Sequence, residues 1–256
     1  MSRTTAAALV LLLSSCVSVS AIPRFGRLDL DGEVGINDAS SGSSASNSIS
    51  DTGLDDDRSV PGARVDLEAA GMTTTFQLSS SSHGGTGTLT ADLDDGTTSI
   101  PAGSTVRSDL DLLLGEAIVT WDFVPGDTVE LGLGFGATLF DVDAQFQDTG
   151  SGDTISTDEV LPLPLLAARV GVALGDFDVS LLAGGFAIEI DDDDATFVDV
   201  DLMARWKVFG AAGRRVGAIV LGYRHVELDL DYDDDDAAVE LDLELSGPYL
   251  GFSLGF

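Results

Sequence analysis

The dominant pattern along this chain is an alternation of apolar and polar residues. Every second residue from Val198 to Val208 is apolar, and the residues between them are charged except Met203. The same period of two runs over residues 129–135 and 239–245. Successive side chains of a β-strand point to opposite faces, so this pattern predicts strands with one apolar and one polar face. Helical spacing is not sustained anywhere after residue 21.

Segments rich in Gly, Pro and Asp divide the pattern into ten strands. We expect these strands at residues 24–36, 62–69, 72–82, 107–123, 128–146, 160–174, 177–190, 196–209, 215–232 and 237–256. Short connections alternate with long ones, which is typical of an up-and-down barrel with tight turns at one end and larger loops at the other. If the first two strands form only an edge hairpin, the barrel has eight strands. The Ser-rich segment 37–61 is predicted to be a disordered loop.

Along four predicted strands, the apolar residues switch partway between odd and even positions, a change of apolar parity. The changes fall between Leu139 and Phe140, near Gly184, near His225 and at Gly247. A β-bulge leaves one residue unpaired and shifts the parity, so we expect a bulge or bend at each place.

The first 21 residues have the features of a secretory signal peptide. Arg3 supplies a positive charge, residues 6–13 are apolar, and Val19-Ser-Ala21 forms a small-residue cleavage site. We therefore expect residues 1–21 to be removed on export and residues 22–256 to form one barrel domain. The sequence Leu13-Ser-Ser-Cys16 resembles a bacterial lipoprotein processing box, which leaves lipidation at Cys16 as an alternative.

Composition excludes several classes of protein. The chain has 44 acidic residues against 12 Lys and Arg, a formal net charge of −32, and 44% hydrophobic residues. That hydrophobic content argues against disorder, and the acidic balance argues against nucleic-acid binding. A single Cys excludes a disulfide scaffold and a Cys-based zinc site. No apolar run reaches 18 residues, so a helical membrane protein is excluded.

The strands of a soluble β-sandwich also alternate apolar and polar residues. The end of the chain helps to decide between a sandwich and a membrane barrel. In Tyr249-Leu-Gly-Phe-Ser-Leu-Gly-Phe256, residues Leu250, Phe252, Leu254 and Phe256 share one face. This ending resembles the C-terminal assembly signal of bacterial outer-membrane β-barrels. The alternating strands as a whole resemble small barrels of the outer membrane protein A and W type. Lipid can cover the apolar face of every strand at once, which a sandwich core cannot do here.

The resemblance implies a closed antiparallel transmembrane barrel of eight to ten strands, with ten as the best count. It also implies a place in the bacterial outer membrane after signal-peptide-dependent export. The implied partners are outer-membrane lipids and, during biogenesis, the barrel-assembly machinery. Trp121, Phe123, Trp206, Phe209 and Phe256 are expected in the aromatic girdle at the periplasmic end.

Parity places two sets of charged residues inside this barrel. Near the periplasmic end we predict an interior ion-pair network, because a small barrel has little room for water; its members are Glu116, Glu130, Arg169, Arg205, Lys207 and Arg224. The alternative is a wet lumen that simply solvates them. Further up, parity together with the assumed bulges directs acids into the lumen, namely Asp109, Asp111, Asp141, Asp143, Glu189, Asp199, Asp201, Glu227, Asp229, Glu240 and Asp242.

Two runs of acidic residues extend this negatively charged region beyond the predicted strands. They form a candidate cation-binding rim consisting of Asp191, Asp192, Asp193, Asp194, Asp233, Asp234, Asp235 and Asp236. Hard divalent cations prefer oxygen ligands, so weakly bound Ca²⁺ is the natural candidate. No stretch has EF-hand spacing, and solvated acidic loops are the favoured alternative. No other cofactor is expected.

The sequence gives little sign of catalysis. The chain has two His residues, His83 after a Ser run and His225 within a strand. Gly251-Phe-Ser-Leu-Gly255 matches the nucleophile-elbow pattern, but that motif needs a helix after the Ser. We therefore expect a structural or passive-permeation (porin-like) protein with an acidic, cation-favouring mouth, and not an enzyme. The alternatives are a surface receptor or adhesin acting through loops 37–61 and 83–106, and a lipid-modifying enzyme using His83 or His225.

Overall fold

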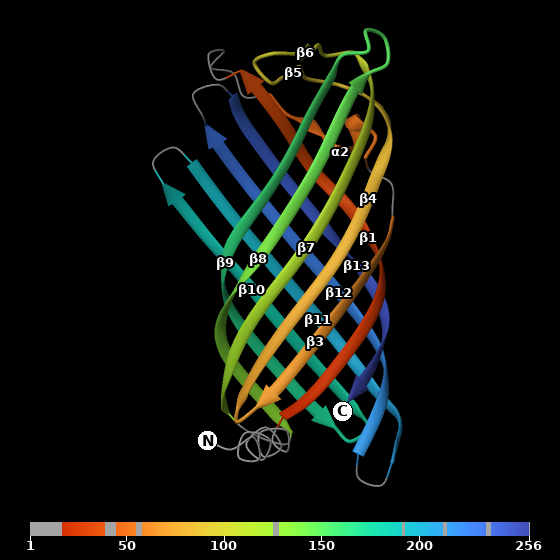
Figure 1. The fold of residues 1–256 in the computed structure, drawn as a ribbon, viewed down its shortest axis with the longest axis vertical. Coiled ribbons are helices and arrows are strands. Elements are labelled where there is room, and N and C mark those ends of the chain that lie inside the picture. Colours follow the sequence, from red (N-terminus) through yellow and green to blue (C-terminus); the bar gives the residue numbers. More distant parts are fainter. Residues whose placement is uncertain are drawn as a thin grey trace, which may run out of the picture.

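The chain forms a closed antiparallel barrel of ten strands (Figure 1). A computed structural model describes residues 17–38, 45–54, 58–124, 128–190, 193–211, 214–233 and 237–255. The barrel strands are β1 (Val17–Asp38), β3 (Arg58–Ala69), β4 (Met72–Thr88), β7 (Thr105–Val124), β8 (Val129–Asp148), β9 (Thr154–Leu174), β10 (Phe177–Ile190), β11 (Asp193–Ala211), β12 (Arg214–Asp233) and β13 (Ala237–Gly255). Each strand pairs with the next in sequence, and β13 pairs with β1 to close the barrel.

The predicted all-β, up-and-down barrel with ten strands is confirmed. The edge-hairpin alternative is wrong, because β1 and β3 pair from Val17↔Ala69 to Leu28↔Arg58 as part of the wall. Strand β1 starts at Val17, so residues 17–21 of the predicted signal peptide pair with β3 in this structure. The cleavage site stays a prediction, and Cys16 lies outside the described residues.

The two ends of the barrel differ in their connections. The start of β1, the end of β13 and short turns lie at one end, here called the turn end (Figure 1). At Ala70 and Gly71 both φ angles are positive (53° and 76°), the backbone of a two-residue hairpin turn. The opposite end, the loop end, carries the two long connections, between β1 and β3 and between β4 and β7.

The loop end is covered by a folded cap made from two of these connections. The cap contains β2 (Asn47–Ser48), α2 (Ile49–Thr52), β5 (Leu93–Asp94) and β6 (Ser99–Ile100). The side chain of Asn47 is fully buried and accepts hydrogen bonds from the backbone N–H groups of Thr90 and Ala91, at 2.8 and 2.9 Å. The prediction of a disordered loop over 37–61 is therefore wrong for residues 45–54, and also for residues 37–38 and 58–61, which belong to β1 and β3. Residues 39–44 and 55–57 lie outside the described part.

The four predicted bulges are also absent. The pairing of β8 with β7 and β9 runs without a register shift past Leu139 and Phe140. The register of β10 with its neighbours at Gly184 and of β12 with β11 and β13 at His225 is also unshifted. At Gly247 the register of β13 is unshifted too, although its pairing with β1 skips Gly247 and Pro248. The register shifts that do occur lie near the turn end, at Asp122/Val124 and after Lys207.

The parity changes mark a reversal of which face is apolar. Near the turn end of β8, Leu133 and Leu139 face outward and are 59% and 54% exposed. Beyond Leu139 the inward residues become apolar, and Phe140 and Phe146 are buried while Asp143 is exposed. The same side of the strand thus faces the interior throughout, and only its chemistry changes.

This reversal corrects the predicted positions of the upper acids. Asp109, Asp111, Asp143, Glu227, Asp229 and Asp242 are exposed on the outer face, and their apolar neighbours point inward. Asp141 and Glu240 are half-buried on the same outer face, and the side chain of Glu189 lies outside the described residues. Only Asp199 and Asp201 of that set are buried inside the barrel.

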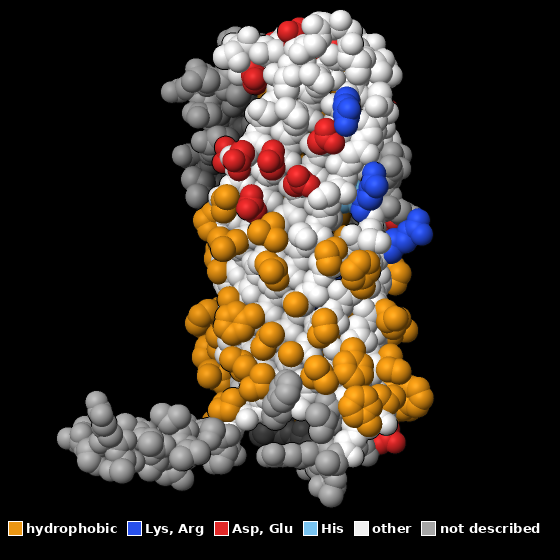
Figure 2. Space-filling model, turned by 45° about the vertical axis from the view of Figure 1, so that its right-hand side comes forward, with side chains coloured by type: hydrophobic (Ala, Val, Ile, Leu, Met, Phe, Trp, Pro, Cys, Tyr) orange, Lys and Arg blue, Asp and Glu red, His pale blue; other side chains and the backbone are white. Residues whose placement is uncertain are grey.

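The outer surface therefore divides into an apolar belt and an acidic upper half. Figure 2 shows hydrophobic side chains around the half near the turn end and acidic side chains directly above them. A strand of 20 residues such as β7 is about 66 Å long, and at the usual barrel tilt it rises about 50 Å. A lipid-facing apolar band is about 25 Å tall, so about half of the barrel extends beyond it.

Aromatic side chains edge the belt at the turn end. Trp121, Phe123, Trp206 and Phe209 are outward and 46–58% exposed, as predicted for a girdle. Phe177 stacks on Trp206 with ring centroids 6.0 Å apart. Leu250 on β13 is 59% exposed in the same belt, and Phe252 and Leu254 are half-buried on that face. Phe256 lies outside the described residues. Among the described residues no helix has the length and hydropathy needed to cross a bilayer.

Candidate functional site in the barrel interior

The interior has three layers from the loop end to the turn end. The first is an apolar core that fills the upper half; it includes Leu28, Leu30, Leu110, Leu112, Phe140, Phe146, Phe197, Leu228, Leu243 and Leu245, all at most 6% exposed. The cap residues Leu89, Leu93 and Ile100 pack on this core from above. Burial of these side chains away from water stabilises the upper half as it would a soluble protein.

The second layer consists of buried ion pairs, and Arg224 on β12 holds its first group. One guanidinium nitrogen, Nη2, lies 2.8 Å from Glu116 Oε2 and 2.6 Å from Asp199 Oδ2. Its Nη1 donates to Ser79 Oγ at 2.9 Å. Glu116 also accepts a hydrogen bond from Gln77 Nε2 at 2.9 Å. These charged side chains are at most 5% exposed, so their mutual contacts replace the water they have lost.

Asp201 on β11 holds the second group. It accepts from Arg24 Nη1 at 2.8 Å, from Arg64 Nη1 at 3.2 Å and from the Tyr249 hydroxyl at 2.5 Å. Arg64 also donates through Nε to Asp66 at 2.9 Å. Four strands, β1, β3, β11 and β13, therefore meet at one carboxylate.

A glycine makes room for this second group. Gly222 on β12 lies opposite Tyr249 on β13, and a Cβ at Gly222 would collide with the Tyr249 ring. The missing side chain lets the ring lie across β12, which brings its hydroxyl to Asp201.

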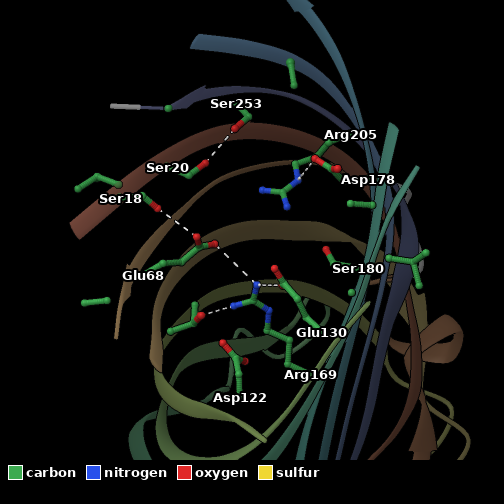
Figure 3. A pocket seen from close by; sticks show the side chains of 18 of the residues that line it. Ser18, Ser20, Glu68, Asp122, Glu130, Arg169, Asp178, Ser180, Arg205 and Ser253 are labelled. Atoms are coloured by element: carbon green, nitrogen blue, oxygen red, sulfur yellow. Dashed lines mark hydrogen bonds and ion pairs between the residues drawn. The ribbon is translucent and has the colours of Figure 1, made fainter. Parts of the chain in front are cut away.

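The third layer is a polar vestibule at the turn end, with a volume of about 1050 Å³ (Figure 3). Arg169 Nη2 lies 2.6 Å from Glu130 and 3.7 Å from Glu68. On another part of the wall, Asp178 receives Lys207 at 2.7 Å and Arg205 at 4.0 Å. A second cavity, of about 20 Å³, lies beside Ser79, Phe140 and Arg224.

The structure places all six predicted network residues inside the barrel, but in separate groups. It brings Glu116 to Arg224 and Glu130 to Arg169. It does not bring Glu116 to Arg205; Arg205 and Lys207 share Asp178 instead. Arg24, Arg64, Asp66 and Asp178 were missed, although each is a charged residue flanked by apolar ones.

The acidic rim is mostly beyond what the structure describes. Asp191, Asp192, Asp234, Asp235 and Asp236, and the side chains of Asp193 and Asp233, lie outside the described residues, and Asp194 is exposed. Within the described ranges no group of three or more His, Cys, Asp or Glu could hold a metal ion. Binding of Ca²⁺ at the rim therefore stays a prediction.

The two His residues lie in different surroundings. His83 is on β4, which continues to Thr88, and its side chain is buried (3% exposed), so the prediction that it begins a long loop is wrong. His225 is on the outer face of β12, with Nδ1 3.3 Å from Glu244 and Nε2 3.6 Å from Glu227.

The acidic residues on the outer face above the apolar belt should make the contribution of Asp242 to stability depend on pH. Partial burial and the carboxylates of Asp229, Glu227, Glu33 and Glu244 raise the pKa of Asp242. A carboxyl whose pKa is higher in the folded state opposes folding when it is ionised. This penalty is complete above the raised pKa and disappears as pH falls below the unfolded value of about 3.9.

Asp242→Asn is therefore expected to raise the urea midpoint at pH 7 and to leave it unchanged near pH 3. Urea titrations of the barrel in vesicles at both pH values measure this, with Asp29→Asn on the same outer surface as the control. A lower midpoint for Asp242→Asn at pH 7 would contradict the argument.

No protein-family model matches the sequence, and no curated protein matches it. Solved structures do. The outer-membrane protease OmpT from Escherichia coli is similar over 93% of this chain and 97% of its own, with a TM-score of 0.61 and 10% identity. The transport unit of the autotransporter AIDA-I from Escherichia coli covers 98% of this chain and 97% of its own, with a TM-score of 0.37 and 11% identity. The outer-membrane protein AlkL in lipid bilayers covers 94% and 90%, with a TM-score of 0.33 and 12% identity.

At these identities the likeness shows the fold alone. The chain has the fold of a small bacterial outer-membrane β-barrel, as the sequence resemblance implied. One fold can carry passive or catalytic roles, so the likeness does not decide between them.

Proposed function

We propose that this protein is a closed, structural β-barrel of the bacterial outer membrane that presents a folded acidic head outside the cell. In this arrangement the turn end faces the periplasm and the loop end faces the medium, as in other barrels of this class. Of the two roles expected from the sequence, structural and porin-like, the interior supports the structural one. The role involves no catalytic step.

The observation that carries this proposal is the filled interior. The ion-pair layer and the apolar core occupy the barrel above the vestibule, and the cavity of about 20 Å³ between them has room for about one water molecule. An open pore needs a continuous polar path, and within the described residues the apolar core interrupts it. Folded cap segments at residues 45–54 and 89–104 add a further layer above the core.

Planar-bilayer recordings test this proposal directly. The purified barrel, shown to be folded by a mobility difference between boiled and unboiled samples, is expected to give no steady conductance in KCl. Vesicles loaded with it are expected not to swell in a small sugar. Discrete conductance steps with cation selectivity would contradict the structural role and favour passive permeation.

A second candidate is surface recognition through the cap, the receptor or adhesin alternative. The buried Asn47 and its two backbone hydrogen bonds tie residues 45–54 to residues 90–91, so the cap can present a defined surface. Replacing residues 89–104 by a short Gly-Ser linker would remove that surface while the barrel strands stay intact. Binding of whole cells to a host or partner surface should then be lost if the cap is the recognition site.

A further inference from the structure

The pairing of β9 with β10 is incomplete and leaves a seam in the barrel wall. Their pairing ends at Gly185↔Leu166, whereas β9 continues along β8 as far as Gln147↔Thr154. Above that point residues 154–165 pair only with β8, and residues 186–190 pair only with β11, among the strands that the structure describes. Figure 1 shows β10 leaving β9 towards the loop end. Two strand edges with unpaired backbone groups therefore face this gap.

The sequence of β9 explains why the pairing stops there. Pro162 and Pro164 each lack the backbone N–H that a ladder needs, and Pro inside a sheet is confined to edge strands. Both lie just beyond Leu166, the last residue paired with β10. The gap is thus a consequence of the sequence of β9.

The seam exposes part of the apolar core. Leu161 and Leu163 pack against the core but are only partly buried, and Phe186 stacks on the buried Phe197 with centroids 6.3 Å apart. Ile188 lies two residues beyond Phe186 on the inward side of β10, yet it is 48% exposed. Apolar side chains and free strand edges in the water-facing half together form a surface that a further strand would cover.

The charge around the seam indicates what kind of strand could bind there. Asp143, Asp158, Glu159 and Asp194 are exposed on the strands that flank it. No Lys or Arg occurs on the described parts of β8 beyond Leu139, of β9 before Leu166, of β10 beyond Gly185, or of β11 before Ala204. A second copy of this chain would bring the same acids to the gap and be repelled. A basic segment would be attracted.

We propose that the seam between β9 and β10 binds an extended cationic segment of a partner protein, which pairs with β9 as an added strand. Main-chain hydrogen bonds to the edge would supply affinity, and alternate apolar side chains would cover Leu163 and Ile188. Lys or Arg side chains on the opposite face would meet Asp158, and Glu159, on the same face as Leu163, adds to the negative charge at this edge. The inference goes beyond the structural role, since a closed barrel needs no such partner.

Hydrogen exchange on the refolded full-length barrel tests the free edge first. Alternate amides in residues 154–165 are expected to exchange quickly, whereas the amides of residues 166–174 are expected to be protected. Uniform protection of 154–165 in the free protein would mean that the edge is already covered, and would overturn the proposal.

The second measurement uses a fluorescent nine-residue peptide of alternating Lys and Val as the probe, with fluorescence anisotropy as the readout. Its matched control is the same peptide with alternate backbone nitrogens methylated, which keeps charge and side chains but cannot pair with an edge. The unmethylated peptide is expected to bind and to protect the β9 amides, and the methylated one is expected to bind at least about tenfold more weakly.

Protein variants separate the seam from general acidity. Asp158→Asn combined with Glu159→Gln is expected to weaken binding about three- to tenfold, whereas Asp29→Asn combined with Asp31→Asn on β1, which is separated from the seam by several strands, should leave it unchanged. Equal binding of the methylated peptide, equal loss in both variants, or no binding would each overturn the proposal. Concentration-dependent dimers whose β9 amides become protected would assign the seam to a second copy instead.

Discussion

Replacement of Arg224 by Met is expected to lower the free energy of unfolding by about 3–5 kcal/mol. The substitution keeps the volume of the side chain but leaves Glu116 and Asp199 buried without the guanidinium that contacts both. Breaking one partner of a buried pair is costly because the remaining charge has lost both water and counterion. Equilibrium unfolding in vesicles, followed by Trp fluorescence, measures the change.

Two controls make this result specific. Arg107→Met removes an exposed pair with Asp109 at 3.7 Å, and its effect should stay below about 1 kcal/mol. The triple variant Glu116→Gln, Asp199→Asn, Arg224→Met removes the unpaired charges together and should recover part of the loss. If Arg224→Met and Arg107→Met had equal effects, the layer would not be the buried network described above.

Phe140→Ala should destabilise the barrel by about 3–5 kcal/mol, the usual range for truncating a buried Phe. Phe140 is 2% exposed in the apolar core, whereas its neighbour Leu139 is 54% exposed in the belt. Leu139→Ala should cost much less, because lipid chains, which are as apolar as Leu, can fill the space it leaves. The same vesicle unfolding assay compares the two variants.

This comparison also tests the reversal of the two faces. If β8 contained a bulge between Leu139 and Phe140, the residues beyond it would change sides, and Phe140 would contact lipid or water. Phe140→Ala would then have the smaller effect. Equal effects of the two substitutions would likewise contradict the interior position of Phe140.

The sequence was sufficient for the strands and their number, and insufficient for the direction of each face. A period of two in β12 shows that Tyr223, His225 and Glu227 share one side, but it does not state whether that side is inside. A change from apolar to acidic along that side can mean a bulge or a change of surrounding solvent. From Ala218 to Asp231 the register of β12 with β11 and β13 is unshifted, which decides for the change of solvent.

The sequence predicted that an interior ion-pair network exists, but it did not predict which residues pair. Parity identifies Glu116 and Arg224 as inward, whereas their contact depends on how strands 108 residues apart in sequence meet across the barrel. Arg24 and Arg64 carried the same inward signal, since exposed Phe25 follows Arg24 and Val65 follows Arg64. Pro162 and Pro164 likewise signalled an edge strand, but only the pairing shows which edge is open.

The acidic upper half has a consequence for insertion kinetics. To reach the far side of the bilayer, outer-face carboxylates such as Asp143, Glu227 and Asp229 must pass through hydrocarbon, where ionised side chains are strongly disfavoured. That barrier slows unassisted insertion, and protonation in acid lowers it. The same barrier opposes movement of these carboxylates back through the bilayer, so an inserted barrel is kinetically trapped at a fixed depth. The charge of the acidic upper half therefore makes insertion effectively irreversible.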